Sequence, residues 1–242
     1  MSSPWVFDAP HYDRLNESRK VWLGRLLQSI SGRQDLRTVL DAGCGMGFFS
    51  AYLSHAGLQA TGLDARADTI TEARHRHPGV TFHVGDIEDV RVREIGRFDC
   101  VLCFGLLYHL ENPFLAIRNL HALAEKILVI ESMITPGRSP VATLMSETAG
   151  EDQGLQHIAF VPSEASLLKM LYHAGFAKVY TTTRLPDHDD FRENLLHRRR
   201  RTMLVASRGT VSSPLLQPVP EPQPQRPDIW RRGIATLLRV TG

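Results

Sequence analysis

The sequence is poor in the features that mark secreted, membrane-spanning and nucleic-acid-binding proteins. Its 242 residues contain three cysteines, too few for a disulfide framework. No apolar run approaches the roughly 20 residues that a membrane-spanning helix needs, and charges scattered through the first 25 positions argue against a signal peptide. The formal net charge of +2 is too small to require a nucleic-acid partner. The expected location is therefore the cytoplasm.

Two of the cysteines, Cys100 and Cys103, have a spacing found in redox and metal motifs. They lie in Phe98–Phe104, whose apolar residues predict a strand. Positions three apart on a strand point to opposite faces. We therefore expect neither a disulfide nor a shared metal here, and the sequence predicts no metal site.

What the chain does have is a glycine turn at residues 39–50, VLDAGCGMGFFS. Apolar residues before Gly43 predict a strand, and the apolar spacing after Gly47 predicts a helix. Such a turn lets backbone approach a ligand closely. A dinucleotide-binding turn has glycine or alanine where this chain has Phe48. An acid at the strand end, Asp41, suits instead a ligand that carries an ammonium group.

Acids also follow the next two predicted strands, at residues 59–64 and 80–84. Asp64 ends the first of these and can accept both hydroxyls of a ribose, although it could also cap the helix predicted after it. Asp86 follows the second and, with the Ile87 backbone, can bind the amino group of adenine, although it could also form a turn. Acids at three successive strand ends favour a ligand site.

A second motif, FDCVLCFGLLYHLENP at residues 98–113, narrows the interpretation. Together with Asp-Ala-Gly-Cys-Gly-x-Gly at residues 41–47, it resembles the class I S-adenosylmethionine (SAM)-dependent methyltransferases. The resemblance is to the branch that contains the tRNA wobble-uridine carboxymethyltransferases and many small-molecule methyltransferases. Residues 160–176 fit the same branch, and the resemblance covers about residues 35–207. It implies an α/β fold with a Rossmann-like, seven-stranded, mostly parallel sheet, helices on both faces and an antiparallel last strand.

The resemblance also implies SAM as the cofactor and assigns roles to individual residues. His109 is the candidate proton acceptor and Tyr108 the candidate residue for orienting the substrate, with packed structural roles as the alternative; Glu131 is a weaker candidate base. The implied cofactor-binding residues come from the glycine turn, the strand-end acids and the fourth strand: Asp41, Gly43, Gly45, Asp64, Asp86, Ile87 and Phe104.

The remaining segments flank this domain. The helix predicted over 13–30 either forms a lid, with Arg14 or Arg19 touching substrate, or covers one face of the sheet. The run of basic residues at 197–201 is interpreted as an exposed lead-in to the last strand, with a phosphate contact to nucleic acid as the less favoured alternative. The expected divisions are an N-terminal arm and lid helix (1–34), the methyltransferase domain (35–208) with a substrate-cap insertion (136–160), a Pro-rich linker (209–227) and a short amphipathic helix (228–242).

The expected activity is methyl transfer from SAM to an oxygen or nitrogen atom of a small-molecule acceptor. A tRNA-modifying transferase is the less favoured alternative, because the chain is only weakly basic. Use of a carboxylated SAM would require a basic residue in the pocket, which the sequence does not locate. A non-catalytic protein that binds a partner or a membrane surface through the C-terminal helix is the third interpretation.

Overall fold

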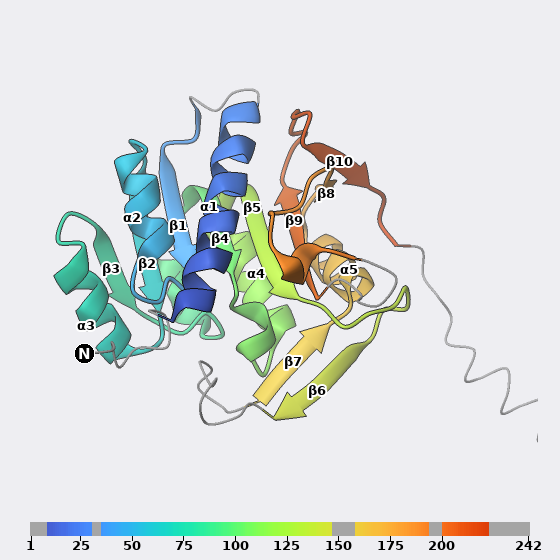
Figure 1. Ribbon diagram of the computed structural model, residues 1–242, viewed down its shortest axis with the longest axis horizontal. Coiled ribbons are helices and arrows are strands. Elements are labelled where there is room, and N and C mark those ends of the chain that lie inside the picture. The colour runs from blue at the N-terminus through green and yellow to red at the C-terminus, as the bar shows by residue number, and fades with distance from the viewer. Residues whose placement is uncertain (1–8, 31–34, 147–157, 194–199, 223–242) are drawn as a thin grey trace, which may run out of the picture.

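A mixed β-sheet forms the centre of the molecule, as the computed structural model shows for residues 9–30, 35–146, 158–193 and 200–222 (Figure 1). Within these residues the main sheet has eight strands in the order β10-β8-β9-β5-β4-β1-β2-β3. Their bounds are β1 (Thr38–Ala42), β2 (Gln59–Asp64), β3 (Thr81–Val84), β4 (Phe98–Phe104), β5 (Ala124–Met133), β8 (Lys178–Thr182), β9 (Arg201–Ser207) and β10 (Leu216–Val219). β9 is antiparallel to β5 and β8, and β10 is antiparallel to β8.

Helices cover both faces of this sheet. α1, α2 and α3 lie in front of it in Figure 1, and α4 and α5 lie behind it. The helices are α1 (Pro10–Ser29), α2 (Phe48–His55), α3 (Ala67–Arg76), α4 (Pro113–Leu123) and α5 (Glu164–Ala174), with the 3-10 turns η3 (Val90–Ile95), η4 (Leu107–His109) and η5 (Asp189–Phe191). The predicted α/β fold class is therefore confirmed.

The alternation of residues along the strands explains the two layers. In β4, Cys100 and Leu102 pack with α1 and α2, whereas Val101 and Cys103 pack with α4 and α5. The four side chains are at most 1% exposed, and each large apolar one contributes roughly 1.5–3 kcal/mol by its burial. Cys100 and Cys103 are free thiols on opposite faces, as their spacing predicted.

Predictions about both ends of the fold were wrong. The first helix was predicted over residues 13–30, but α1 begins at Pro10, whose fixed φ suits the first turn of a helix. We also expected residues 209–227 to be an extended linker and the sheet to have seven strands. Within that segment, β10 pairs with β8 and adds an eighth strand. Pro218 is compatible with this pairing because β10 lies at the edge of the sheet.

The predicted insertion at 136–160 contains part of a β-hairpin. Its strands, β6 (Ala142–Ser146) and β7 (Ile158–Pro162), pair antiparallel in a separate two-stranded sheet. The hairpin stands beyond the C-terminal ends of the parallel strands (Figure 1). The following helix is capped as predicted, because the Ser163 hydroxyl accepts a hydrogen bond from the Ser166 backbone and Gly175 ends the helix with φ +113°.

The predicted C-terminal helix at 228–242, with its expected partner or membrane contact, lies outside the described residues and stays a prediction. Within the described part of the chain, no helix has the length and apolar character needed to cross a lipid bilayer.

Candidate functional site

The glycine turn between β1 and α2 is held by backbone hydrogen bonds. The N–H groups of Gly43 and Cys44 both donate to the carbonyl oxygen of Leu63 in β2, at 2.8 and 3.0 Å. Gly47 has φ +86°, and a Cβ there would lie 2.7 Å from the Phe82 ring. Glycine is therefore required at this position both for conformation and for space.

This turn borders a cavity of about 550 Å³ at the C-terminal ends of the strands. The volume is within the usual range for small-molecule sites, roughly 300–1,000 Å³. All but one of the sequence-predicted site residues line it: Gly43, Gly45, Asp64, Asp86, Ile87, Phe104, Tyr108 and His109. α1 contributes part of the wall through Tyr12, Asn16 and Arg19, while its buried face covers the sheet. The helix therefore covers the sheet and also borders the cavity, and its role as a lid that touches substrate stays a prediction.

Asp41 is the predicted site residue that does not line the cavity. It is 2% exposed and accepts a hydrogen bond from the Ser50 hydroxyl of α2 at 2.7 Å. Burial raises its pKa from 3.8 to about 6, against the opposing effect of the Ser50 hydrogen bonds. The structure thus places Asp41 behind the glycine turn, so a direct contact with a ligand is not part of the observed geometry.

Asp64 lies in the cavity wall at the end of β2. Its Oδ2 accepts the Gly45 N–H at 3.0 Å, which ties the acid to the glycine turn. The Arg66 guanidinium also binds both carboxylate oxygens, at 3.0 and 3.2 Å. The alternative role as a helix cap is not observed, because α3 begins after Arg66 without a side-chain cap.

Asp86 and Ile87 follow β3 on the same cavity. Asp86 accepts the Glu88 N–H at 2.8 Å, so it does form a turn as well as line the cavity. Ile87 is 4% exposed, and its carbonyl oxygen accepts a hydrogen bond from Asn119 at 2.7 Å. Because this loop is fixed from both sides, its position relative to β2 is well defined.

Tyr108 and His109 lie in η4, just after β4, and their rings are 4.2 Å apart. Burial, together with the charges of Arg201 and Arg66, lowers the pKa of His109 from 6.5 to about 4. The imidazole is therefore neutral near pH 7, but it is a weak base. A general base works best when its pKa is near the working pH, so this geometry favours a hydrogen-bonding role for His109.

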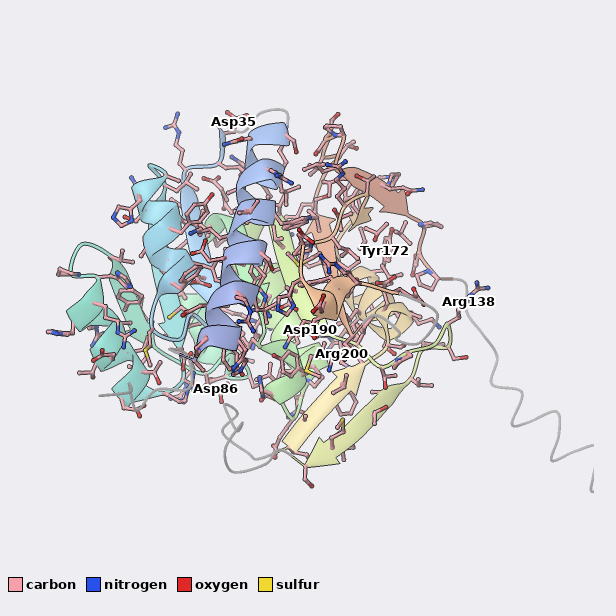
Figure 2. All side chains as sticks on the ribbon, viewed as in Figure 1. Asp35, Asp86, Arg138, Tyr172, Asp190 and Arg200 are labelled. Carbon is pink, nitrogen blue, oxygen red and sulfur yellow. The ribbon has the colours of Figure 1, made fainter. Side chains whose placement is uncertain are left out.

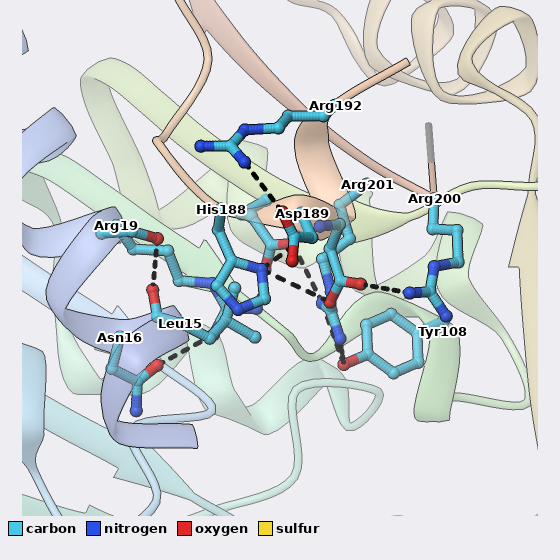
Figure 3. A network of polar contacts seen from close by, with 12 residues as sticks. Leu15, Asn16, Arg19, Tyr108, His188, Asp189, Arg192, Arg200 and Arg201 are labelled. Atoms are coloured by element: carbon cyan, nitrogen blue, oxygen red, sulfur yellow. Dashed lines mark hydrogen bonds and ion pairs between the residues drawn. The ribbon is translucent and has the colours of Figure 1, made fainter. Parts of the chain in front are cut away.

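A buried ionic group adjoins these two side chains. We call Arg19, Tyr108, Glu131, Asp190 and Arg201 the arginine cluster. Glu131 is fully buried and binds Arg19 at 2.5 Å and Arg201 at 3.0 Å. Arg201 also donates to the Tyr108 hydroxyl at 3.3 Å and to Asp190 at 3.3 Å (Figure 3).

The arginine cluster corrects two predictions. Glu131 was expected at the end of the fifth strand as a weak base candidate. It lies within β5 and is engaged by two guanidinium groups, which stabilise its anion. Arg201 was expected in an exposed lead-in, but it is 8% exposed and belongs to β9. Burial lowers its pKa, but Tyr108 and Glu131 outweigh this and raise it above the ordinary value.

A second cavity, of about 1,740 Å³, meets the first at Tyr12, Asp13, Tyr108 and His109. Its walls come from α1, β7 and residues 184–192, together with Arg200 and Arg201. In Figure 2, Asp190 and Arg200 lie close together on the β9 side of α1, whereas Asp86 lies near the lower end of that helix. Among the described residues, no group of three or more His, Cys, Asp and Glu side chains is arranged to hold a metal.

Comparison with known protein families gives a match over the segment that contains the glycine turn, Asp64 and Asp86. A family model described as a methyltransferase domain matches residues 39–126. A ubiquinone biosynthesis O-methyltransferase from Bordetella avium is 30% identical over 115 residues, which are 46% of this chain and 46% of that relative. The protein of the same name from Xanthomonas axonopodis pv. citri is 27% identical over 182 residues, 71% of this chain and 74% of the relative. The chain thus covers less than half of the Bordetella relative's length.

Solved structures agree on the fold. The N-terminal domain of EvdMO1, determined in the presence of S-adenosylhomocysteine (SAH) and D-fucose, has a TM-score of 0.61 at 19% identity, with 82% of this chain and 84% of that chain covered. CalS10, an amino pentose methyltransferase from Micromonospora echinaspora, has a TM-score of 0.53 at 20% identity, covering 82% and 91%. The matched methyltransferase domain covers less than half of the chain, and the solved structures share its fold. These comparisons give no support to the tRNA-modifying alternative.

Proposed function

We propose that the protein is a cytoplasmic enzyme that transfers a methyl group from SAM to an oxygen or nitrogen atom of a small-molecule acceptor. One observation carries this proposal. The glycine turn, Asp64 and the Asp86–Ile87 loop follow three neighbouring strands and line one cavity. Relatives named as O-methyltransferases and sugar methyltransferases support a small acceptor.

The residues of the first cavity fit the cofactor. A Cβ at Gly43 would lie 3.0 Å from the Leu106 side chain, so glycine lets Leu106 pack closely against the turn. The turn itself lines the cavity, where its backbone would lie beside the methionine end. Asp64 would hold the ribose hydroxyls, and Asp86 with Ile87 would hold adenine. Asp41 would act from behind the turn, where its negative charge favours a cationic ligand.

SAM supplies an activated methyl group when it is bound. The chain's part is to align an acceptor, exclude water and accommodate a proton. Tyr108 and His109 lie where the two cavities meet, so they are placed to orient an acceptor that enters from the second cavity. Neutral His109 can hydrogen-bond an acceptor hydroxyl or amine without adding charge to a site that already contains the arginine cluster.

The proposal is tested by calorimetric titration of the full chain with SAM, SAH and, separately, NAD. We expect SAM and SAH to bind and NAD not to bind. Asp64→Ala removes the proposed acceptor for two ribose hydroxyls. It should weaken the binding of SAH by about 10- to 100-fold, because hydrogen bonds to a charged group contribute roughly 1.5–3 kcal/mol.

The matched control is Asp68→Ala, which removes an exposed acid that does not line the cavity. It should leave SAH affinity unchanged. A folded wild-type protein that fails to bind SAM and SAH, or binds NAD equally well, would contradict the proposed function.

A further inference from the structure

Asn119 is a fully buried polar side chain within an apolar layer. It lies on α4, behind the sheet (Figure 1). Its helix neighbours Ile117 and Leu120 belong to the same buried cluster as Ile87, which follows β3. A buried amide is costly unless its polar atoms are hydrogen-bonded. The partners of Asn119 therefore show what this side chain holds in place.

These partners all lie in the segment that follows β3. The amide nitrogen of Asn119 donates to the carbonyl oxygens of Ile87 at 2.7 Å and Asp89 at 3.4 Å. The amide oxygen accepts the Nε–H of Arg93 at 2.8 Å. Asn119 thus ties α4 to the loop that carries Asp86 and to η3 beyond it.

The peptide group between Ile87 and Glu88 links Asn119 to the first cavity. Its carbonyl oxygen accepts the Asn119 amide, and its N–H donates to Oδ1 of Asp86 at 2.8 Å. The C=O and N–H bonds of a trans peptide are coplanar and point in opposite directions. A side chain that fixes this carbonyl therefore fixes the N–H as well, and with it the orientation of the Asp86 carboxylate.

This orientation leaves one oxygen of Asp86 available to a ligand. Oδ1 accepts the Glu88 N–H, whereas no described residue donates a hydrogen bond to Oδ2. Asp86 lines the first cavity, where the proposed function places adenine. An ionised carboxylate only accepts hydrogen bonds. Oδ2 therefore suits an amino group and disfavours a carbonyl oxygen.

We propose that Asn119 is a positioning residue that makes the cofactor site selective for a purine with a 6-amino group. This inference rests on the proposed function, in which Asp86 binds adenine. A purine with oxygen at position 6 would bring two acceptors together with no proton between them. Without Asn119 the peptide can turn, Asp86 can move away from that oxygen, and the selectivity is lost.

The test compares SAH with S-inosylhomocysteine, in which oxygen replaces the 6-amino group. Calorimetric titration of the full chain gives both affinities. The wild type should bind SAH at least about tenfold more tightly, as expected when one hydrogen bond to a charged group is lost. A preference of this size would show that the site distinguishes the amino group from the oxygen.

Asn119→Asp removes the donor and keeps the size of the side chain. The Arg93 guanidinium keeps the new carboxylate ionised, so it still accepts from Arg93 but cannot donate to Ile87. The preference for SAH should fall below about threefold, because the peptide that orients Asp86 is no longer fixed.

A second variant tests the same contact without placing two acceptors together. Asn119→Ala leaves space for water, which can satisfy the Ile87 carbonyl without fixing its direction. It should also lower the preference for SAH. The control is Arg93→Met, which removes an exposed partner of Asn119 but leaves the donors to the loop intact. This control should retain the wild-type preference.

Ser163→Ala controls for a general loss of stability. Ser163 is also fully buried, its hydroxyl caps α5, and it does not line either cavity. Its removal should lower the urea midpoint and leave the ratio of the two affinities unchanged. A merely structural Asn119 would give this same pattern, so the ratio separates positioning from stability.

Four results would overturn the inference. The first is equal binding of SAH and S-inosylhomocysteine by the wild type. The second is a wild-type preference in every folded Asn119 variant. The third is an equal loss of preference in Ser163→Ala. The fourth is loss of the fold in both Asn119 variants, which would make the residue structural. Failure of the proposed function is distinguishable, because the wild type would then not bind SAH at all.

Discussion

The two halves of the site are built in different ways. The half around the glycine turn uses residues 43–47, 64 and 85–88, each directly after one of three consecutive strands, and backbone N–H groups fix its geometry. The half around the arginine cluster joins Arg19 to Glu131 across 112 positions and Arg201 to Glu131 across 70. The first half is thus local in sequence, whereas the second exists only in the folded chain.

This difference predicts different sensitivities. The glycine turn depends on backbone conformation and free space, so added side-chain atoms should destabilise it. The buried ionic cluster depends on charge balance, so removing one of its charges should lower the free energy of unfolding more than removing an exposed charge does.

The largest effect is expected at the arginine cluster. Arg201→Met leaves Glu131 with one partner and removes the donors to the Tyr108 hydroxyl. It should lower the free energy of unfolding by about 3–5 kcal/mol, the usual cost of breaking a buried ion pair. Urea denaturation measures the change.

Arg192→Met is the matched control for that variant. Arg192 also binds two acids, Asp187 at 2.5 Å and Asp189 at 2.9 Å, but its side chain is 61% exposed (Figure 3). Exposed ion pairs contribute little to stability, so its urea midpoint should stay near that of the wild type. Equal losses in both variants would mean that burial does not distinguish the two arginines.

An intermediate effect is expected in the glycine turn. Gly47→Ala places a Cβ 2.7 Å from the buried Phe82 ring, whereas Gly57→Ala, with the same φ of +86°, meets nothing within 4 Å. Backbone strain alone costs roughly 1–2 kcal/mol, and crowding adds about 1–3 kcal/mol. Gly47→Ala should therefore destabilise the protein by about 2–4 kcal/mol and also weaken the binding of SAH. Matching urea curves for the two variants would show that the turn tolerates added bulk.

The smallest effect concerns pH, to which Asp41, behind the glycine turn, and His109, beside the arginine cluster, respond in opposite directions. The pKa of Asp41 is raised from 3.8 to about 6, so its stabilising contribution is full below pH 4 and is lost as pH rises through 6. The pKa of His109 is lowered from 6.5 to about 4, so its contribution is full above pH 6.5 and is lost as pH falls through 4. In the wild type these trends offset each other between pH 4 and 6.

Single substitutions should expose each trend. Asp41→Asn leaves the His109 response, so the free energy of unfolding should rise with pH between 4 and 6.5. His109→Gln leaves the Asp41 response, so stability should fall over the same interval. Each change should amount to about 1–3 kcal/mol, because one pKa unit is worth about 1.4 kcal/mol. Parallel stability–pH curves for the two variants would show that these groups do not titrate as described.

The sequence predicted that the glycine turn, Asp64 and Asp86 meet at one edge of the sheet, because the signals for each are local. The glycines, the acids and the flanking apolar runs lie within short segments, and each strand end brings its acid to the same edge of the sheet. Asp41 is the exception. Its side chain alternates onto the face covered by α2 and meets Ser50, a packing detail that a strand-end rule does not contain.

The second half could not be predicted for physical reasons. A run of four arginines at 198–201 ordinarily indicates a solvated surface. Only the pairing of β9 with β5 brings Arg201 beside Glu131. β10 was missed because Gln217 and Pro218 interrupt the apolar alternation typical of a strand, while its pairing at the edge of the sheet tolerates the proline.

The placement of the cysteines gives the molecule built-in reporters of local unfolding. Cys44 lies in the glycine turn, Cys100 faces α1 and α2, and Cys103 faces α4 and α5, and all three are free and buried. A thiol reagent can reach Cys100 or Cys103 only after its own layer has opened, whereas Cys44 also lines the first cavity. The reaction rates of Cys100 and Cys103 therefore report separately on the two helical layers, without any introduced label.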